Sequence, residues 1–410
     1  MKCRFLRTAC VAGLCLAVLT GAALAGSVRI LVPEYSARTR PYFADAKREF
    51  EAANPDTDIQ VEMVPWDELR RKLATGLGEK AGPDIAIINR RWLVDFVKLD
   101  AIKPLDEFLT DEFKSRFIGS FLSAAVVDGK IHGLPFTASV SALYYNKDLL
   151  GKAGIAEAPK TWDELKAAAE KVSALGSGVY GYGLPGKGVD ADIYYYYVMW
   201  GRGVEVIDEN GRSGLASDGA IAAAKFCKEL IDRGATQPAV TSFPREGVEN
   251  LFKEGKLGML IAAPRFAKQI RETGRGLNYG VAAVPAGPTG ARGTYGEADA
   301  IVMFKNAEDK REAWSFIEYL FTPAMRARFT QDESFLPVTG EEAESELYVN
   351  DAELKVLIAL LPAARFTPLI AGWEIVAQRT IEALQKVYLG GDADTTLKAV
   401  AEEINRILLK

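Results

Sequence analysis

The stretch DGKIHGLPFTASVSALYYNKDLLGKAGIAEAPKTWDEL, residues 128–165, decides the fold of this chain. It predicts a strand that leaves one domain, a short crossing segment, a second strand and a loop into a helix. The helix begins with a capping box, in which the Thr161 side chain accepts from the N–H of Glu164 and the Glu164 carboxylate reaches back. This order predicts a chain that passes between two domains.

Strands and helices alternate before this stretch. Strands are predicted at 28–32, 58–64 and 84–88, with helices at 40–53 and 67–77 between them. The run 84–88 is continuously apolar, which is typical of a strand buried on both faces. This rhythm indicates βαβ units and a mostly parallel sheet.

The pattern continues after the crossing. Helices are predicted at 161–175, 218–232 and 310–321, and apolar strands at 257–261 and 300–304. The chain from residue 354 onward is predicted to be mostly helical and to pack on the second domain.

The N-terminus has the pattern of a cleavable export signal. Lys2, Arg4 and Arg7 precede an apolar run at 9–19, and Ala23-Leu24-Ala25 matches a small-x-small cleavage site. The apolar run is shorter than the roughly 20 residues that a spanning helix needs. Cys15 follows a leucine rather than a small residue, which disfavours lipidation. We therefore expect residues 1–25 to be a signal peptide.

Cysteine content and charge exclude two classes of protein. Of the 4 Cys, only Cys227 lies beyond the expected signal, so no intramolecular disulfide is expected. Removing the signal's three basic residues from the 50 Lys+Arg leaves 47 against 55 Asp+Glu, a net charge of −8. An acidic chain lacks the basic footprint that nucleic acids require. The length predicts two domains.

Several motifs occur in an order that is itself specific. They are GKIHGLP at 129–135, LYYNK at 143–147, PKTWDEL at 159–165 and FKEGKLGM at 252–259. This order resembles extracellular solute-binding protein family 1, the sugar-type, maltose-binding-protein-like receptors of bacterial ABC importers. His132 stands where that family more often has Tyr.

The resemblance implies an α/β fold of the periplasmic-binding-protein-like type II, in which two α/β lobes are joined by a multi-segment hinge with a ligand cleft between them. It implies crossings near 128–137, 279–285 and 336–338. The expected division is a signal peptide at 1–25, an N-terminal lobe from 26–136 plus 284–330, and a C-terminal lobe from 137–283 plus 331–410.

The expected site lies at the strand ends. In open α/β sheets the ligand lies beyond the carboxyl ends of the strands, so two facing lobes make a cleft there. The loops at these ends combine aromatic, carboxylate and guanidinium groups, which suit carbohydrates because a ring covers a sugar's C–H face while polar groups bond its hydroxyls. The expected ligand-binding residues are Tyr35, Trp66, Arg90, Arg91, Ser139, Ser141, Lys187, Asp192, Tyr195, Trp200, Arg265, Gly296, Glu297 and Trp373. No catalytic residue, metal ligand or cofactor is expected.

Several of these assignments have alternatives. Trp66 opens a helix and could simply pack, and at most one of the adjacent Arg90 and Arg91 is expected to face the ligand. Arg90, Arg91, Lys187 and Arg265 could bring positive charge to the cleft, and arginine forks match phosphate, sulfonate or carboxylate oxygens. A neutral sugar, a polyol, a sugar sulfonate and a glycerol-phosphate ester therefore all stay open as ligands.

The resemblance implies a monomeric periplasmic receptor that captures a carbohydrate-like solute by hinge closure and delivers it to the membrane permease of an ABC importer. Two alternatives stay open. A ferric-ion-binding transport protein would draw ligands from Tyr194-Tyr195-Tyr196-Tyr197, although successive helical residues point about 100° apart. A two-lobed α/β enzyme acting on a sugar would have one His in the whole chain and one Cys after the signal for its chemistry.

Overall fold

The structure is a computed structural model that describes residues 26–78, 82–176, 178–188, 190–273 and 276–408. The expected signal peptide at 1–25 lies outside the described residues. Across the described ranges, no helix combines the length and the apolar character that crossing a lipid bilayer requires.

The N-terminal lobe is built on a five-stranded sheet, here called the first sheet. In order across the sheet its strands are β2 (Thr57–Val64), β1 (Gly26–Pro33), β3 (Ile85–Asn89), β13 (Asp299–Met303) and β6 (Leu134–Pro135). β1 is parallel to β2 and β3, whereas β13 runs antiparallel to β3 and β6. The four predicted strands of this lobe are confirmed, each to within two residues.

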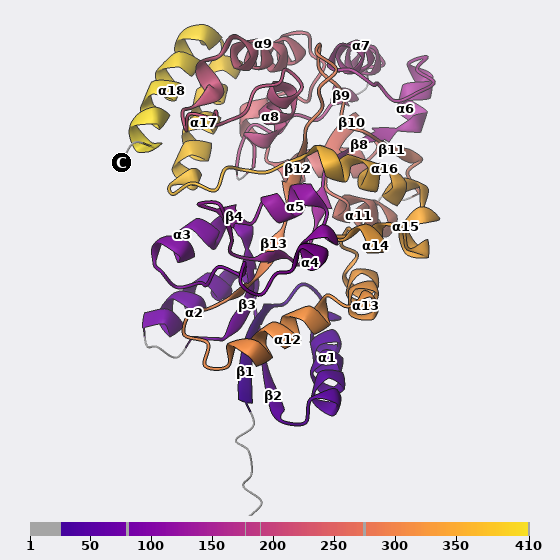
Figure 1. Ribbon diagram of the computed structural model, residues 1–410. Coiled ribbons are helices and arrows are strands. Elements are labelled where there is room, and N and C mark those ends of the chain that lie inside the picture. Colours follow the sequence, from indigo (N-terminus) through magenta and orange to yellow (C-terminus); the bar gives the residue numbers. More distant parts are fainter. Residues whose placement is uncertain (1–25, 79–81, 177, 189, 274–275, 409–410) are drawn as a thin grey trace, which may run out of the picture.

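Helices cover both faces of the first sheet. Apolar side chains of α1 (Thr39–Ala53) at 42, 43, 46 and 50 form one buried stripe, as helical spacing requires. Figure 1 shows α12 beside α1 in the lower half of the molecule. The other elements of this lobe are α2 (Trp66–Gly78), η1 (Arg90–Trp92), α3 (Leu93–Lys98), α4 (Asp111–Ser115), α5 (Gly119–Ser123), β4 (Val126–Val127), β5 (Lys130–Ile131), α12 (Lys310–Leu320), α13 (Pro323–Glu333), α14 (Gly340–Ala343), α15 (Glu346–Val349) and η4 (Leu361–Ala363). The helix α16 (Ala352–Leu360) also packs against the sheet of the C-terminal lobe, as expected for the chain from residue 354 onward.

The C-terminal lobe is built on a four-stranded second sheet. Its strands, in order, are β11 (Tyr279–Ala282), β8 (Ala142–Asn146), β10 (Leu257–Ala262) and β9 (Tyr180–Tyr182). Every residue of β10 is buried, as its continuous apolar run predicts. The other elements are α6 (Lys147–Lys152), α7 (Trp162–Ser173), α8 (Ile193–Trp200), η2 (Gly214–Ala216), α9 (Asp218–Asp232), η3 (Val240–Ser242), α10 (Arg245–Lys253), α11 (Arg265–Thr273), α17 (Trp373–Tyr388) and α18 (Ala393–Leu408).

The predicted cap of α7 is confirmed in one half. The Thr161 side chain accepts from the N–H of Glu164 at 3.2 Å. The Glu164 carboxylate accepts from the N–H of Lys160, at 2.6 Å, rather than from that of Thr161. The helix therefore begins where the sequence predicts. The second hydrogen bond of the cap uses the N–H of Lys160, one residue before the Thr161 that a capping box would use.

A small third sheet, here called the connecting sheet, joins the lobes. Its strands, in order, are β14 (Ala364–Arg365), β12 (Thr294–Glu297) and β7 (Ser139–Val140). β7 leads into the second sheet, β12 leads back into the first, and β14 precedes α17 and α18. Figure 1 shows β12 between the two halves, with α17 and α18 in the upper one.

The connecting sheet corrects two expected crossings. Residues 279–282 form β11, which pairs with β8 inside the second sheet, so the second passage comes later, at β12. Leu336 and Val338 pack in the core of the N-terminal lobe, so the third passage comes at β14. The expectation for residues 279–282 failed because an apolar strand at the edge of a sheet and an apolar segment that crosses between lobes have similar sequences. Only the hydrogen bonds to a neighbouring strand distinguish the two. The division of the chain into two bodies that move against each other stays a prediction.

Candidate ligand-binding site

Arg91 is the residue that joins the most parts of the site. It follows β3, and the Asn89 side chain accepts from its N–H at 2.9 Å, which starts the short helix η1. Its guanidinium reaches Asp190 at 3.1 Å, the hydroxyl of Tyr295 in β12, and Glu374 in α17 at 3.8 Å. One side chain thus connects the carboxyl end of the first sheet with the connecting sheet and two segments of the C-terminal lobe.

Tyr295 and Asp190 also set the electrostatics of Arg91. Burial lowers the pKa of the Arg91 guanidinium, but the attraction of Tyr295 and Asp190 outweighs it, so the pKa is raised overall. Asp190 has a φ of 65°, in the left-handed region that non-glycine residues seldom occupy. Such strain is often kept at binding sites.

A chain of alternating charges continues from Asp190 into the C-terminal lobe. Arg245 in α10 lies 3.4 Å from Asp190 and 3.8 Å from Glu249. Arg265, the first residue of α11, lies 3.7 Å from the same Glu249. We call Arg91, Asp190, Arg245, Glu249 and Arg265 the charged chain.

Glu297 ends β12 and faces the charged chain from the connecting sheet. Its side chain is exposed to solvent, yet desolvation and the nearby Asp190 raise its pKa, whereas Arg91, Arg245 and Arg265 lower it. The charge of Glu297 therefore interacts with charged residues of both lobes.

A cavity of about 200 Å³ lies beside Arg91. Residues of both lobes form its wall: Arg91, Gly188, Asp190, Asp192, Ile193, Thr367, Trp373, Glu374, Ala377, Gln378 and Ile381. Asp192 is 2% exposed, and its Oδ2 has no well-formed hydrogen bond among the described residues. Burial, and then the charge of Asp190, raise the pKa of Asp192 to about 7. A buried carboxylate oxygen without a hydrogen-bond donor costs free energy. A ligand that brings a donor to this part of the wall would therefore be stabilised.

Larger hollows lie elsewhere. One of about 710 Å³ lies beside Lys253 and Lys256, one of about 620 Å³ lies along β1 and β2, and one of about 330 Å³ lies between α13 and α14. None of the three is lined by the connecting sheet or by the strand ends that face the second lobe. We therefore place the site at the smaller cavity, where the two lobes meet.

Five expected site residues come together here. Arg91, Asp192 and Trp373 line the cavity, while Glu297 and Arg265 lie on the charged chain or beside it.

Arg90 has a different role from its neighbour. Its side chain is buried, and it donates to the carbonyl oxygens of Ala124, at 3.1 Å, and Thr367. Its guanidinium lies 4.9 Å from the centre of the Phe366 ring, and burial lowers its pKa to about 10. The position corrects the expectation of ligand contact, because the side chain is buried and its guanidinium bonds groups of the protein.

The aromatic helix α8 also corrects two expectations. Tyr195 is fully buried and donates to the carbonyl of Ala220 in α9 at 3.0 Å, and Tyr194 donates to that of Ile261 at 3.1 Å. Trp200 is buried against the rings of Tyr196 and Tyr197. A helix that is apolar on all sides belongs in a core. Among the described residues, no cluster of three or more His, Cys, Asp or Glu could hold a metal ion.

The aromatic pair of the N-terminal lobe lies apart from the cavity wall. Tyr35 and Trp66 meet edge to face at 5.6 Å, and the Tyr35 hydroxyl donates to Asp299 at 2.8 Å. The Trp66 ring also contacts Trp92. Tyr35 lies on the loop after β1 and Trp66 opens α2 just after β2, and their contact with ligand stays a prediction.

Of the four remaining expected residues, Ser139, Ser141 and Gly296 lie in or beside the connecting sheet, and Lys187 lies apart. Ser139 pairs with Glu297 in the connecting sheet, and the N–H of Ser141 donates to the carbonyl of Tyr295 at 3.2 Å. A Cβ at Gly296 would lie 2.8 Å from the Phe366 ring, so this glycine permits close packing. Lys187 is exposed and outside the cavity wall.

Sequence reasoning missed Asp190, Arg245, Glu249 and Tyr295 as members of the site. Asp190 follows a glycine-rich loop before α8, where an acid is inconspicuous. Tyr295 lies on a crossing strand that the sequence had placed elsewhere. Arg245 and Glu249 are four residues apart on α10, which is equally typical of a solvated helix face.

The fold and the site define a class: a two-lobed α/β protein of the periplasmic-binding type, with a polar cleft between the lobes. Residues 34–327 match the family described as bacterial extracellular solute-binding protein. The chain belongs to this family.

Relatives and solved structures agree with that assignment. A binding protein of Brucella abortus (strain 2308) is 53% identical over 401 residues, which is 98% of both chains. The maltotriose-binding protein of Pyrococcus abyssi is 27% identical over 318 residues, 76% of this chain and 65% of that protein. The cyclic α-maltosyl-1,6-maltose binding protein of Arthrobacter globiformis has the same fold, with a TM-score of 0.83 at 22% identity over 93% of this chain and 98% of that one.

Proposed function

We propose that this protein captures a carbohydrate-like solute in the periplasm and delivers it, unconverted, to the membrane permease of an ABC importer. The observation that carries the proposal is Arg91, which contacts both lobes and the connecting sheet at the wall of a cavity. Membership of the solute-binding family supports it, as do relatives that are named for binding maltotriose and maltodextrin.

The lining of the site suits a polyhydroxylated ligand. A sugar hydroxyl both donates and accepts, and the charged chain alternates donors with acceptors along its length. Trp373 adds an aromatic wall on which a ring's C–H face can lie. A ligand placed here would contact both lobes at once.

Closure follows from that geometry. The lobes are joined through three strands of two to four residues, which are short enough to bend. A ligand that contacts both lobes binds the closed state more tightly than the open one, so it shifts the equilibrium toward closure. The permease would then recognise the closed form.

A ligand screen with two further measurements tests the proposal. We expect some neutral sugars, amino sugars or polyols to raise Tm and to bind one per chain by calorimetry, because a ligand that binds only the folded state stabilises it. X-ray scattering should show a smaller radius of gyration with ligand, and chromatography should recover the ligand unchanged. Conversion of the ligand to a product, or an unchanged radius at saturation, contradicts the proposal.

The expected export of the protein has its own test. N-terminal sequencing of the protein secreted from a bacterial host should begin at Gly26. A mature protein that still carries residues 1–25 contradicts periplasmic capture.

A further inference from the structure

The charges around the site do not balance. Arg91, Arg245 and Arg265 each have a carboxylate within 4.0 Å. Asp192, which lines the cavity, and Glu297, which ends β12 near Asp190 and Arg91, form no ion pair with any described residue. The arginines, which the sequence suggested as an anion site, are thus already neutralised by the protein, and the unpaired groups are acids.

The cavity wall itself is acidic. Its side chains include one cation, Arg91, and three carboxylates, Asp190, Asp192 and Glu374. The exposed Lys187 precedes the wall residue Gly188, but its side chain does not line the cavity. An anionic solute would bring its charge next to this acidic wall, at an unfavourable Coulomb energy.

Asp192 is the second, independent observation. Its carboxylate is 2% exposed and lines the cavity, and Oδ2 has no well-formed hydrogen bond among the described residues, although the Tyr196 hydroxyl lies close enough to interact with the carboxylate. A neutral hydroxyl would complete the hydrogen bond but would leave the wall acidic. An ammonium group would complete the bond and supply the missing positive charge.

Trp373 adds a surface that favours the same chemistry. Its indole lines the cavity, with its centroid 6.4 Å from that of Tyr196. Aromatic faces attract cations and also cover the C–H face of a sugar ring. An acid beside an indole matches a ring that carries an amine.

We infer that the solute is an amino sugar, with its ammonium group at Asp192 and its ring against Trp373. This inference rests on the proposed function, because it names the kind of sugar that the same cleft takes. The ammonium would donate to Oδ2 of Asp192, and Asp190 and Glu374 would lie on its other sides. Arg91 would donate to a hydroxyl of the same ring.

Matched sugars test the inference. D-glucosamine, D-galactosamine and the β-1,4-linked glucosamine disaccharide are titrated by calorimetry at pH 7.5, above the pKa of about 7 of Asp192, against their hydroxyl parents D-glucose, D-galactose and cellobiose. The N-acetylated forms serve as uncharged derivatives. We expect at least one amine to bind about tenfold or more tightly than both its parent and its N-acetyl form.

Three variants test whether Asp192 causes the preference for an amino sugar over its parent sugar. Asp192→Asn keeps the size of the side chain and removes its charge, so it should reduce about tenfold the ratio of the affinity for the amine to the affinity for its parent sugar. Glu374→Gln should give a smaller loss, because this carboxylate is 69% exposed. Asp111→Asn, at a fully exposed carboxylate on α4, should retain the wild-type preference.

The outcomes separate this inference from the proposed function. If parent sugars bind as well as the amines, or if Asp192→Asn keeps the preference, the amino-sugar inference is wrong and sugar capture stands. If only sugar phosphates or sulfonates bind, the inference is also wrong. If no amine binds, it fails as well, and if no sugar, polyol or derivative in the full screen binds, the proposed function fails with it.

Discussion

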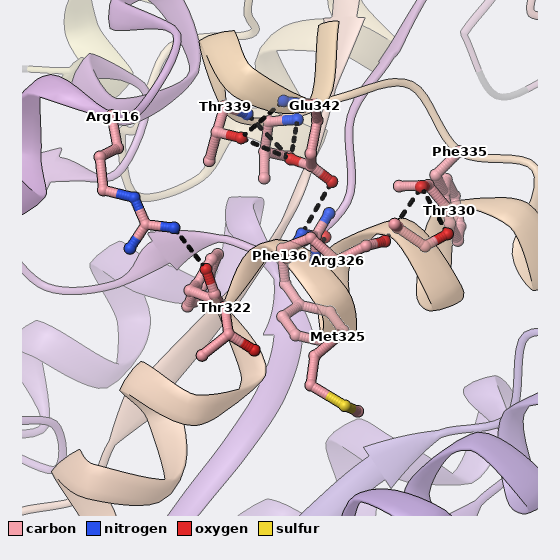
Figure 2. Close-up of polar contacts among 12 residues, drawn as sticks. Arg116, Phe136, Thr322, Met325, Arg326, Thr330, Phe335, Thr339 and Glu342 are labelled. Atoms are coloured by element: carbon pink, nitrogen blue, oxygen red, sulfur yellow. Dashed lines mark hydrogen bonds and ion pairs between the residues drawn. The ribbon is translucent and has the colours of Figure 1, made fainter. Parts of the chain in front are cut away.

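Arg326 and Glu342 form an ion pair in the core of the protein, with Nε and Oε1 2.9 Å apart and side chains 1% and 5% exposed. Figure 2 shows the pair between α13 and α14. Nη1 of Arg326 also donates to the carbonyl of Phe136 at 3.0 Å, three residues before β7 begins. The other Glu342 oxygen accepts from the N–H groups of Val338 and Thr339 at 3.0 Å. The pair therefore fixes the chain where the first passage between the lobes starts.

Removing one member of this pair should destabilise the protein strongly. Arg326→Met leaves the Glu342 carboxylate buried without its cation, and we expect a loss of about 3–5 kcal/mol in the free energy of unfolding. The double variant Arg326→Met/Glu342→Leu should lose less than the sum of the two single variants, because neither charge is then left alone. Urea unfolding measures all three.

A surface pair provides the control for this prediction. Arg379 and Glu403 are 2.9 Å apart with both side chains more than 40% exposed, so Arg379→Ala should cost less than about 1 kcal/mol. Equal losses for Arg326→Met and Arg379→Ala would contradict the assigned role of burial.

Gly287 makes a second prediction about stability. A Cβ at this position would lie 1.7 Å from the carbonyl oxygen of Gly201, at the end of α8. Because the three nearest atoms all belong to the backbone of Gly201, no side chain can move away, and Gly287→Ala should cost about 3 kcal/mol. Gly151→Ala in α6, where nothing lies within 4 Å, should instead be neutral or stabilising by up to about 1 kcal/mol. Thermal unfolding of both variants decides the matter.

Strong local patterns made the lobes predictable. The apolar runs at β3 and β10 are buried as complete strands, and the capped helices α7 and α9 begin where their cap residues stand. These features depend on neighbours in sequence. The connecting sheet does not: Thr294–Glu297 pairs with Ser139–Val140, about 155 residues earlier, and its sequence has no period of its own.

The site was predictable in part for the same reason. Arg91 and Trp373 follow from their places after a strand and at a helix start, but their partners lie far away in sequence. Arg90 and Arg91 look alike in the chain, and only the surroundings of β3 make one structural and the other part of the cavity. Tyr195 was misplaced because a tyrosine repeat suits a binding surface and a buried helix equally well.

The two adjacent arginines should separate stability from binding. Arg90→Met loses bonds to two carbonyl groups inside the protein, so we expect a loss of about 2–4 kcal/mol in the free energy of unfolding. The affinity of the folded variant for the best sugar of the screen should stay within about threefold.

Arg91→Met should instead lower the affinity for the ligand more than the stability of the protein. Its guanidinium is partly exposed and lines the cavity, so we expect affinity to fall about tenfold or more, with a smaller change in stability. Urea unfolding and calorimetric titration of the same samples give both quantities. If the two variants have the same effects on both, the distinction between their roles is wrong.

Asp192 should make stability depend on pH near neutrality. Its pKa of about 7 lies above the value of about 3.9 for an unfolded chain, because burial and Asp190 disfavour the charged form. The folded state thus holds this proton more tightly, and its stabilising effect is complete below about pH 4. It is lost as pH rises through about 7, by about 2–4 kcal/mol.

Asp192→Asn stays neutral, so the variant should match the wild type at pH 4.5 and exceed its stability at pH 8.5. Urea unfolding between these pH values gives the two curves, and Asp111→Asn should follow the wild type throughout because that carboxylate is fully exposed. Curves for wild type and Asp192→Asn that run parallel over this range would show that Asp192 is already ionised in the unliganded protein.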